Sequence, residues 1–274
     1  MKKILLIIIS FIILSAHDMF LRMDSFFLDP NTSSTIHLYN GTFNESDNII
    51  TRDRMLDASI VHSGIRNLID TSQWSELDSS ITVLHFKTGE PGTYVAGVST
   101  RARDIELEAK SFNEYLEHDG VLDILDQRKK DGTMDQSAIE KYSKHVKIIF
   151  QVGEERSEDW KTVLDYPIEF VPLTNPYDLE KGDYMEMQLL RNGIPLSNQL
   201  VYGGFSDGGH SHTHGGDHEP HHHDEKSMRT DAKGMFKFKL DHGGKWYVRT
   251  IHMVLSEEPG LTHESNWATL TFEV

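Results

Sequence analysis

The sequence predicts a mainly β fold, with two immunoglobulin-like or transthyretin-like β-sandwich domains and a helical insertion in the first of them. Two observations carry this prediction. Short runs in which apolar and polar residues alternate recur along most of the chain, separated by turn residues such as those at 90–92, which is typical of sandwich strands. Helical spacing of apolar residues is confined to one stretch near the middle, at about 111–147.

The first domain is expected at residues 17–155, and its helical stretch interrupts a series of short strands. Ser111 with Glu114 and Ser137 with Glu140 form two capping boxes, each ahead of apolar residues at helical spacing. We therefore expect two or three helices within residues 111–149. The expected strands of this domain lie at 35–39, 59–62, 81–86, 93–98 and 148–152.

The second domain is expected at residues 166–274, where the apolar spacing returns to period two. Met185, Met187 and Leu189 alternate with more polar neighbours, and a turn at 231–234 leads into a further strand. Six or seven strands result. The last of them is expected to pack on one face only, because its apolar residues all face one way; these are Ala268, Leu270, Phe272 and Val274.

The first sixteen residues have the composition of a secretory signal peptide, because Lys2 and Lys3 precede an apolar run at 4–14. That run is shorter than the roughly 20 residues that a membrane-spanning helix needs. We expect cleavage after Ala16, which makes His17 the first residue of a soluble mature chain in the periplasm.

The composition limits the partners and the chemistry of the protein. The chain has no cysteine, which excludes disulfides, thiolate catalysis and thiolate metal sites. It holds 27 Lys and Arg against 43 Asp and Glu, a net charge of −16. Nucleic acid and anionic membrane surfaces are therefore poor partners, whereas cations are attracted. Any bound metal must use nitrogen and oxygen ligands.

A long loop rich in histidine is expected at residues 203–230, between two strands of the second domain. It holds seven of the sixteen histidines of the chain, with Asp and Glu residues among them. In an extended segment every second side chain points the same way, so three imidazoles can face one ion. Neutral imidazole suits zinc, nickel, copper and cobalt. The predicted ligands are His210, His212, His214, His218, His221, His222 and His223.

The character of this loop leaves several interpretations open. Glycine pairs at 208–209 and 215–216 favour adaptable coordination, in which the metal is cargo rather than a catalytic cofactor. The loop could also be a low-complexity insertion whose metal binding is incidental, or a pH sensor, since imidazoles titrate near neutrality. The chain contains no nucleophile elbow, phosphate-binding glycine loop or zinc-protease helix motif, and we do not expect an enzyme.

His17 is a second candidate metal ligand, because the imidazole and the free amine of a mature N-terminal histidine can chelate one ion together. A copper oxidoreductase would need a further histidine beside it. His252 and His263 could serve only if the fold brings them close. His145 is expected on a helix and in a structural role.

Seven segments resemble a family of Gram-negative periplasmic proteins that carries a domain of unknown function. This family is associated with nickel and cobalt uptake and often found beside transporters. The resemblance spans nearly the whole mature chain and implies a periplasmic, metal-associated β-sandwich protein; it fixes no catalytic residue. The segments are 17–21 (HDMFL), 112–116 (FNEYL), 140–147 (EKYSKHVK), 152–153 (VG), 172–177 (PLTNPY), 231–234 (DAKG) and 267–272 (WATLTF).

The leading hypothesis from the sequence is a periplasmic protein that captures or buffers nickel, cobalt or zinc for a metal transporter of the inner or outer membrane. The alternative is an envelope binding or adhesion module in which the histidine loop is incidental. A copper oxidoreductase built on His17 is a third hypothesis.

Overall fold

The computed structural model describes residues 17–206 and 225–274. The expected signal peptide, residues 1–16, and all seven predicted loop ligands, between 210 and 223, lie outside the described residues. The chain is mainly β, as the sequence predicts. No helix among the described residues is long and apolar enough to cross a membrane.

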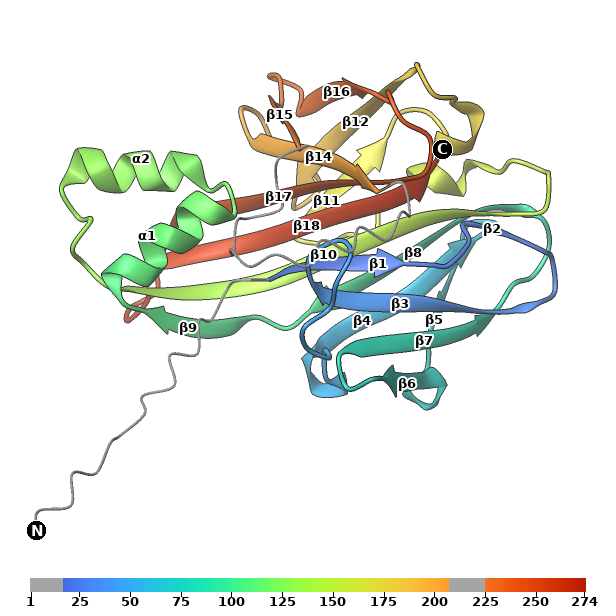
Figure 1. Ribbon diagram of the computed structural model, residues 1–274, viewed down its shortest axis with the longest axis horizontal. Helices are drawn as coiled ribbons and strands as arrows, with labels where there is room; N and C mark the ends of the chain where they lie inside the picture. Colours follow the sequence, from blue (N-terminus) through green and yellow to red (C-terminus); the bar gives the residue numbers. More distant parts are fainter. Residues whose placement is uncertain (1–16, 207–224) are drawn as a thin grey trace, which may run out of the picture.

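A ten-stranded sheet forms the centre of the molecule and takes strands from both halves of the chain. The long strands β10 (Ala138–Val152) and β18 (His263–Glu273) pair in parallel and run side by side through its middle (Figure 1). Strand order is β15-β14-β17-β18-β10-β8-β4-β5, and β2 and β9 also pair with β10. The other bounds are Lys226–Arg229 (β15), Leu200–Ser206 (β14), Lys245–Leu255 (β17), Gly92–Thr100 (β8), Met55–His62 (β4), Ile65–Leu68 (β5), Phe27–Leu28 (β2) and Arg103–Leu107 (β9).

Two four-stranded sheets lie on either side of this central sheet (Figure 1). The N-terminal sheet has the order β1-β3-β7-β6, with bounds Asp18–Arg22, Ser33–Gly41, Ile81–Lys87 and Trp74–Leu77. The C-terminal sheet is built around β12 (Tyr184–Arg191), which pairs with β11 (Ile168–Pro172), β13 (Ile194–Pro195) and β16 (Met235–Lys239). Short 3-10 helices occur at Arg52–Arg54, Thr71–Gln73, Glu158–Lys161 and Pro176–Asp178.

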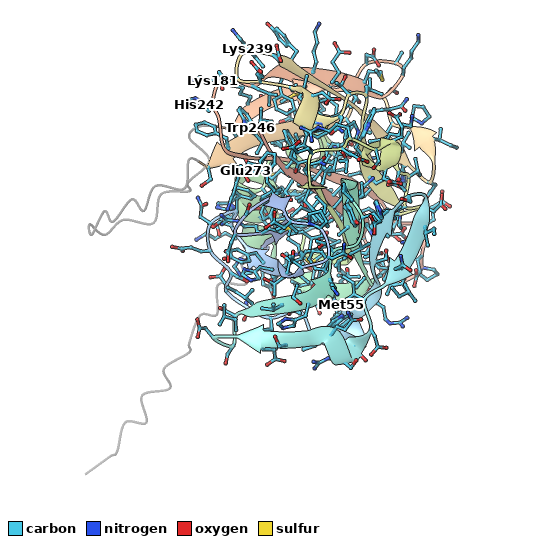
Figure 2. All side chains as sticks on the ribbon, turned by 90° about the vertical axis from the view of Figure 1, so that its right-hand side faces the viewer. Met55, Lys181, Lys239, His242, Trp246 and Glu273 are labelled. Atoms are coloured by element: carbon cyan, nitrogen blue, oxygen red, sulfur yellow. The ribbon has the colours of Figure 1, made fainter. Side chains whose placement is uncertain are left out.

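One apolar core joins the three sheets. It contains Met55 and Trp246, which Figure 2 shows in the lower and upper parts of the molecule, together with Phe150 and Phe170. Burial of apolar surface is the main stabilising term in folding. The core therefore holds both halves of the chain together.

Two helices, α1 (Ala109–His118) and α2 (Leu122–Asp131), cover one end of the long strands (Figure 1). Phe112 and Leu116 of α1 pack on Ile251 and Trp267 in a second apolar cluster. These two helices confirm the predicted helical insertion over residues 109–131. The predicted capping box at Ser111 is wrong, because α1 already begins at Ala109, with Glu108 at its N-cap.

The helix predicted after Ser137 is also wrong, because residues 138–152 form β10. The last ten residues of this strand are all buried. Its β-branched residues, among them Val146, Ile148 and Ile149, suit a strand that is paired on both sides. Burial on both faces hides the alternation that marks a strand in sequence.

The prediction that the last strand packs on one face only is wrong for a similar reason. Residues 267–272 of β18 are all buried. The hydroxyls of Thr269 and Thr271 donate to the backbone carbonyls of Met19 and Leu21 in β1, at 2.8 and 2.6 Å. Strand β1 therefore covers the face of β18 that the sequence left to solvent.

The predicted histidine loop is shorter than residues 203–230. Strand β14 continues to Ser206, and β15 begins at Lys226 and pairs with it, Gly203 opposite Lys226. Both ends of the expected loop therefore belong to the edge of the central sheet. Residues 207–224 lie between them.

Candidate functional site

Five charged side chains gather in the interior where β1, the end of α1, β10 and β17 meet. Asp18, Asp119, Lys144 and Arg249 are 8%, 4%, 6% and 2% exposed, and the side chain of Glu225 is 5% exposed. Burying an isolated charge is costly, so buried charges are paired. We call these five residues the buried charge cluster.

Arg249, on β17, binds the carboxylates of this cluster. Its Nε and Nη2 donate to the two oxygens of Glu225 at 2.8 and 2.7 Å, and its Nε lies 3.5 Å from Asp18 Oδ2. Its Nη1 donates to the backbone carbonyl of Asp119 at 3.0 Å. These carboxylates raise the pKa of Arg249 against the effect of burial. Glu225 also accepts from the Tyr247 hydroxyl, at 2.8 Å.

Glu225 gives the cluster a direct link to the predicted histidine loop. It is the first described residue after 207–224, and its bonds to Arg249 and Tyr247 fix this end of the loop in the interior. Asp18, the other carboxylate near Arg249, directly follows His17. The neighbour of His17 in the chain, Asp18, and the residue that ends the loop, Glu225, therefore both contact the guanidinium of Arg249.

His17 lies at the border of the cluster, at the start of β1. Its Nδ1 is 3.2 Å from Asp47 Oδ2, and its side chain is 26% exposed. Burial lowers the pKa of His17, and the charges of Asp119 and His118 act on it as well. The Lys144 ammonium donates to the backbone carbonyl of His17.

Burial changes the ionisation of two other cluster members. It raises the pKa of Asp18 to about 6, although Arg249 acts in the opposite direction. It lowers the pKa of Lys144 to about 8, while Asp18 and Asp119 act to raise it. The ammonium of Lys144 also donates to Asn40 Oδ1 at 3.0 Å.

His118 and Asp119 end helix α1 and form a pair. His118 Nδ1 lies 2.7 Å from Asp119 Oδ1, and this hydrogen bond raises the pKa of His118. The other oxygen, Asp119 Oδ2, is buried and has no hydrogen-bond partner among the described residues. Gly120 follows with φ +77°, and its carbonyl accepts from the Tyr202 hydroxyl at 2.9 Å.

The two histidines that the sequence offered as partners for His17 are engaged elsewhere. The ring nitrogens of His252 lie 2.8 Å from Gln199 Oε1 and 2.7 Å from Arg191 Nη1. His263 is buried at the start of β18, with Nδ1 2.8 Å from the Thr262 hydroxyl. Burial lowers the pKa of each to about 4, which keeps both imidazoles neutral at neutral pH.

His145 lies on β10, not on the helix that the sequence predicts. Both of its ring nitrogens are 2.9 Å from serine hydroxyls, those of Ser99 and Ser143. It is 2% exposed, and burial lowers its pKa to about 4. Its surroundings are those of a neutral, hydrogen-bonded core residue, as expected for a structural role.

The sequence reasoning missed His118, Asp119, Lys144 and Arg249. They come from three places far apart in the chain, at 118–119, 144 and 249, and none of these places carries a sequence motif. One signal was available for Arg249, because it interrupts a run of apolar and β-branched residues, and buried charged residues are rare unless paired. Among residues 17–206 and 225–274, no three His, Asp or Glu side chains already form a metal-binding group.

The chain belongs to the family described as domain of unknown function DUF4198, whose model matches residues 14–254. No curated protein matches its sequence.

Solved structures with similarity to this chain include immunoglobulin-like domains. The D0–D1 domains of intimin share 12% identity, with 94% of this chain and 98% of that chain covered and a TM-score of 0.21. A DUF4785 family protein from Legionella pneumophila shares 8% identity, with coverage of 83% and 50% and a TM-score of 0.25. Two tandem immunoglobulin domains of titin share 9%, with coverage of 94% and 95% and a TM-score of 0.19.

Proposed function

We propose that the mature protein binds divalent transition-metal ions in the periplasm, with nickel, cobalt and zinc as its cargo, and releases them to a membrane transport system. The observation that carries this proposal is the attachment of the histidine loop to the buried charge cluster through Glu225. Glu225 holds the C-terminal end of the loop at this cluster, and Asp18 of the same cluster directly follows His17. Seven clustered imidazoles in a chain of net charge −16 attract and hold such ions.

The proposal also accounts for the composition of the loop. Glycine pairs at 208–209 and 215–216 lie among its histidines and carboxylates, which allows several coordination arrangements of similar energy. Such a loop favours exchange over selectivity, as delivery of cargo requires. The family resemblance to proteins associated with nickel and cobalt uptake agrees with this use.

The test compares the mature chain with a variant in which all seven loop histidines are replaced by serine, here called the loop-serine chain. Isothermal titration with Ni²⁺, Co²⁺ and Zn²⁺ should show binding to the mature chain and loss of most equivalents in the loop-serine chain. Replacement of exposed His85, on β7, is the matched control and should change nothing. Equal binding by the mature and loop-serine chains would refute the proposal.

A second candidate, an envelope binding module, is favoured by one edge of the central sheet. Strand β5 is the last strand of that sheet, and its Ile65 and Leu68 are 61% and 73% exposed. An apolar edge strand can pair with a strand of a partner. Crosslinking from position 68 in whole cells to a specific envelope protein, with metal uptake unchanged in the loop-serine strain, would favour this candidate.

A further inference from the structure

We propose that a cavity between helix α2 and the joined ends of β17 and β18 binds a small free α-amino acid, whose carboxylate is held by Arg128 and whose amino group is held by His263 and Asp131. All three residues line this cavity, which has a volume of about 190 Å³. It lies at the end of the long strands that the two helices cover (Figure 1). The inference goes beyond the proposed metal binding and uses none of the predicted metal ligands.

Arg128, on α2, is a buried cation without a carboxylate partner. It is 5% exposed, and buried charges are ordinarily paired. No carboxylate of residues 17–206 or 225–274 forms an ion pair with it. Burial lowers the pKa of Arg128, and only the more distant charge of Asp135 acts in the opposite direction. A ligand carboxylate in the cavity would supply the missing partner.

The guanidinium of Arg128 is held in place and still has N–H groups to offer. Its Nε donates to Asn113 Oδ1 at 2.9 Å, and its Nη2 donates to the Gln136 carbonyl at 2.6 Å. A guanidinium has five N–H donors, so these two bonds leave three, including both on Nη1. Nη1 is not among the buried atoms that lack a partner, so a ligand oxygen can reach it. Arginine pairs with carboxylates through two parallel hydrogen bonds of this kind.

His263, at the start of β18, lies beside Arg128 and offers an acceptor. Both rest on the ring of Phe112, whose centroid is 4.9 Å from the imidazole centroid and 4.9 Å from Arg128 Cζ. The Thr262 hydroxyl donates to the Ile139 carbonyl at 3.0 Å, so it accepts from Nδ1 of His263, 2.8 Å away. Burial lowers the pKa of His263 to about 4, and a neutral imidazole has one N–H. Its Nε2 is therefore an acceptor, and it suits an amino group.

Asp131 places a negative charge at the same cavity. It follows Arg128 by three residues on α2, so the two side chains project from one face of the helix. Both line the cavity, yet no ion pair joins them in the part of the chain that the structure describes. An α-amino acid carries a carboxylate and an ammonium group on one carbon. It can therefore meet the charges of both residues at once.

The remaining wall and the size of the cavity limit the ligand. Ile124 and Leu255 line it with apolar groups, and Leu255 stands opposite His263 in the pairing of β17 with β18. Its volume is below the roughly 300–1,000 Å³ of pockets for drug-sized ligands. A short apolar side chain such as that of valine fits these limits, because it buries its surface against the two aliphatic residues.

The experiment follows amide shifts in the nuclear magnetic resonance spectrum of the metal-free mature chain. L-Valine is the probe, isovalerate is its analogue without the amine, and isobutylamine is its analogue without the carboxylate. We expect one L-valine site, with shifts at 124–137 and at the ends of β17 and β18. L-Valine should bind at least about tenfold more tightly than either analogue, because each analogue leaves one charged group of the cavity unpaired.

Two variants test the residues without removing Arg128, whose bonds also hold the end of α2. Leu255→Trp fills the mouth of the cavity and should weaken L-valine binding at least about tenfold, whereas Leu56→Trp is the matched control. Leu255 and Leu56 are 57% and 60% exposed, and unchanged thermal unfolding of both variants shows that the fold is intact. Asp131→Asn should weaken L-valine binding roughly tenfold without weakening that of isovalerate, a difference that a merely structural role would not produce.

The loop-serine chain should bind L-valine as tightly as the mature chain, because the cavity does not include the histidine loop. Absence of L-valine binding, equal binding of L-valine and isovalerate, or equal effects of Leu255→Trp and Leu56→Trp would overturn the amino acid site. Loss of L-valine binding in the loop-serine chain would also overturn it. None of these results bears on metal binding by the loop, so the two proposals fail separately.

Discussion

At the scale of single residues, the ion pair between Lys147 and Glu169 is the most deeply buried in the described chain. The side chains are 1% and 2% exposed, and Lys147 Nζ lies 2.9 Å from Glu169 Oε2. Lys147→Met would leave Glu169 as an uncompensated buried charge. We expect a loss of about 3–5 kcal/mol in the free energy of unfolding, measured by urea denaturation.

Two variants control this prediction. Lys161→Met removes an exposed pair, in which Lys161 and Glu158 are 54% and 74% exposed, and should cost less than about 0.5 kcal/mol. Glu169→Gln added to Lys147→Met removes the uncompensated charge and should restore part of the stability. A cost for Lys147→Met no larger than that for Lys161→Met would contradict the account.

Glu140 predicts a pH dependence of stability. Burial raises its pKa to about 7, against hydrogen bonds from Ser265 and Tyr115. Because the folded state then binds the proton more tightly than the unfolded state, this group stabilises the protein most below its unfolded pKa of 4.5. That contribution is lost as the pH rises from about 4.5 to 7 and is constant above, a change of about 3 kcal/mol.

Glu140→Gln isolates this effect, because the amide oxygen can still accept both hydrogen bonds. The difference between wild-type and Glu140→Gln unfolding free energies should change by about 3 kcal/mol between pH 4.5 and pH 7.5, with the wild type losing stability as the pH rises. Parallel stability profiles for the two proteins would show that Glu140 titrates normally.

The residues of the candidate sites differ in how far sequence could reveal them. The loop histidines can be recognised in the sequence by their density, and His17 can be recognised by its place after the expected cleavage point. His118 and Asp119 look like an ordinary helix end, because Arg249, which donates to the Asp119 carbonyl, lies on β17 and is brought near only by the fold. The loop ligands stay a prediction, since they lie outside the described residues.

At the scale of elements, the end of α1 depends on Gly120. Its φ of +77° is unfavourable for other residues, and a Cβ there would lie 2.4 Å from the Tyr202 hydroxyl. Gly132 ends α2 with a similar φ of +67°, but a Cβ there would meet open space. Gly132→Ala should cost about 1 kcal/mol, and Gly120→Ala about 1–3 kcal/mol more.

Thermal unfolding of the two glycine variants measures this difference. Equal destabilisation by the two substitutions would mean that the contact with Tyr202 does not constrain the helix end.

Sequence identified most strands and both helices, and its errors at β10 and β18 have one cause. Alternation is visible where one face of a strand meets solvent, as in β12. It disappears in β10 and β18, which are buried on both faces. Without it, the spacing of Ser137 and Glu140 matches the sequence pattern of a helix N-terminus. Pairing of β10 with β18 over 140–148 is a long-range contact, and local spacing carries no information about it.

At the scale of the whole molecule, the shared central sheet predicts one cooperative unfolding unit. Nine residue pairs join β10 to β18, and one apolar core contains residues from both halves. Differential scanning calorimetry should show a single transition whose calorimetric and van't Hoff enthalpies agree. Two separate transitions would instead support the two independent domains, divided near 153–166, that the sequence predicts.

The central claim is that the protein carries transition-metal ions in its own cell. Elemental analysis of the protein isolated from the native periplasm, without added metal or an affinity tag, tests this claim most directly. The account predicts nickel, cobalt or zinc bound to the wild-type protein and a clear loss of that metal in the loop-serine chain. Wild-type protein with no more transition metal than the loop-serine chain would contradict it.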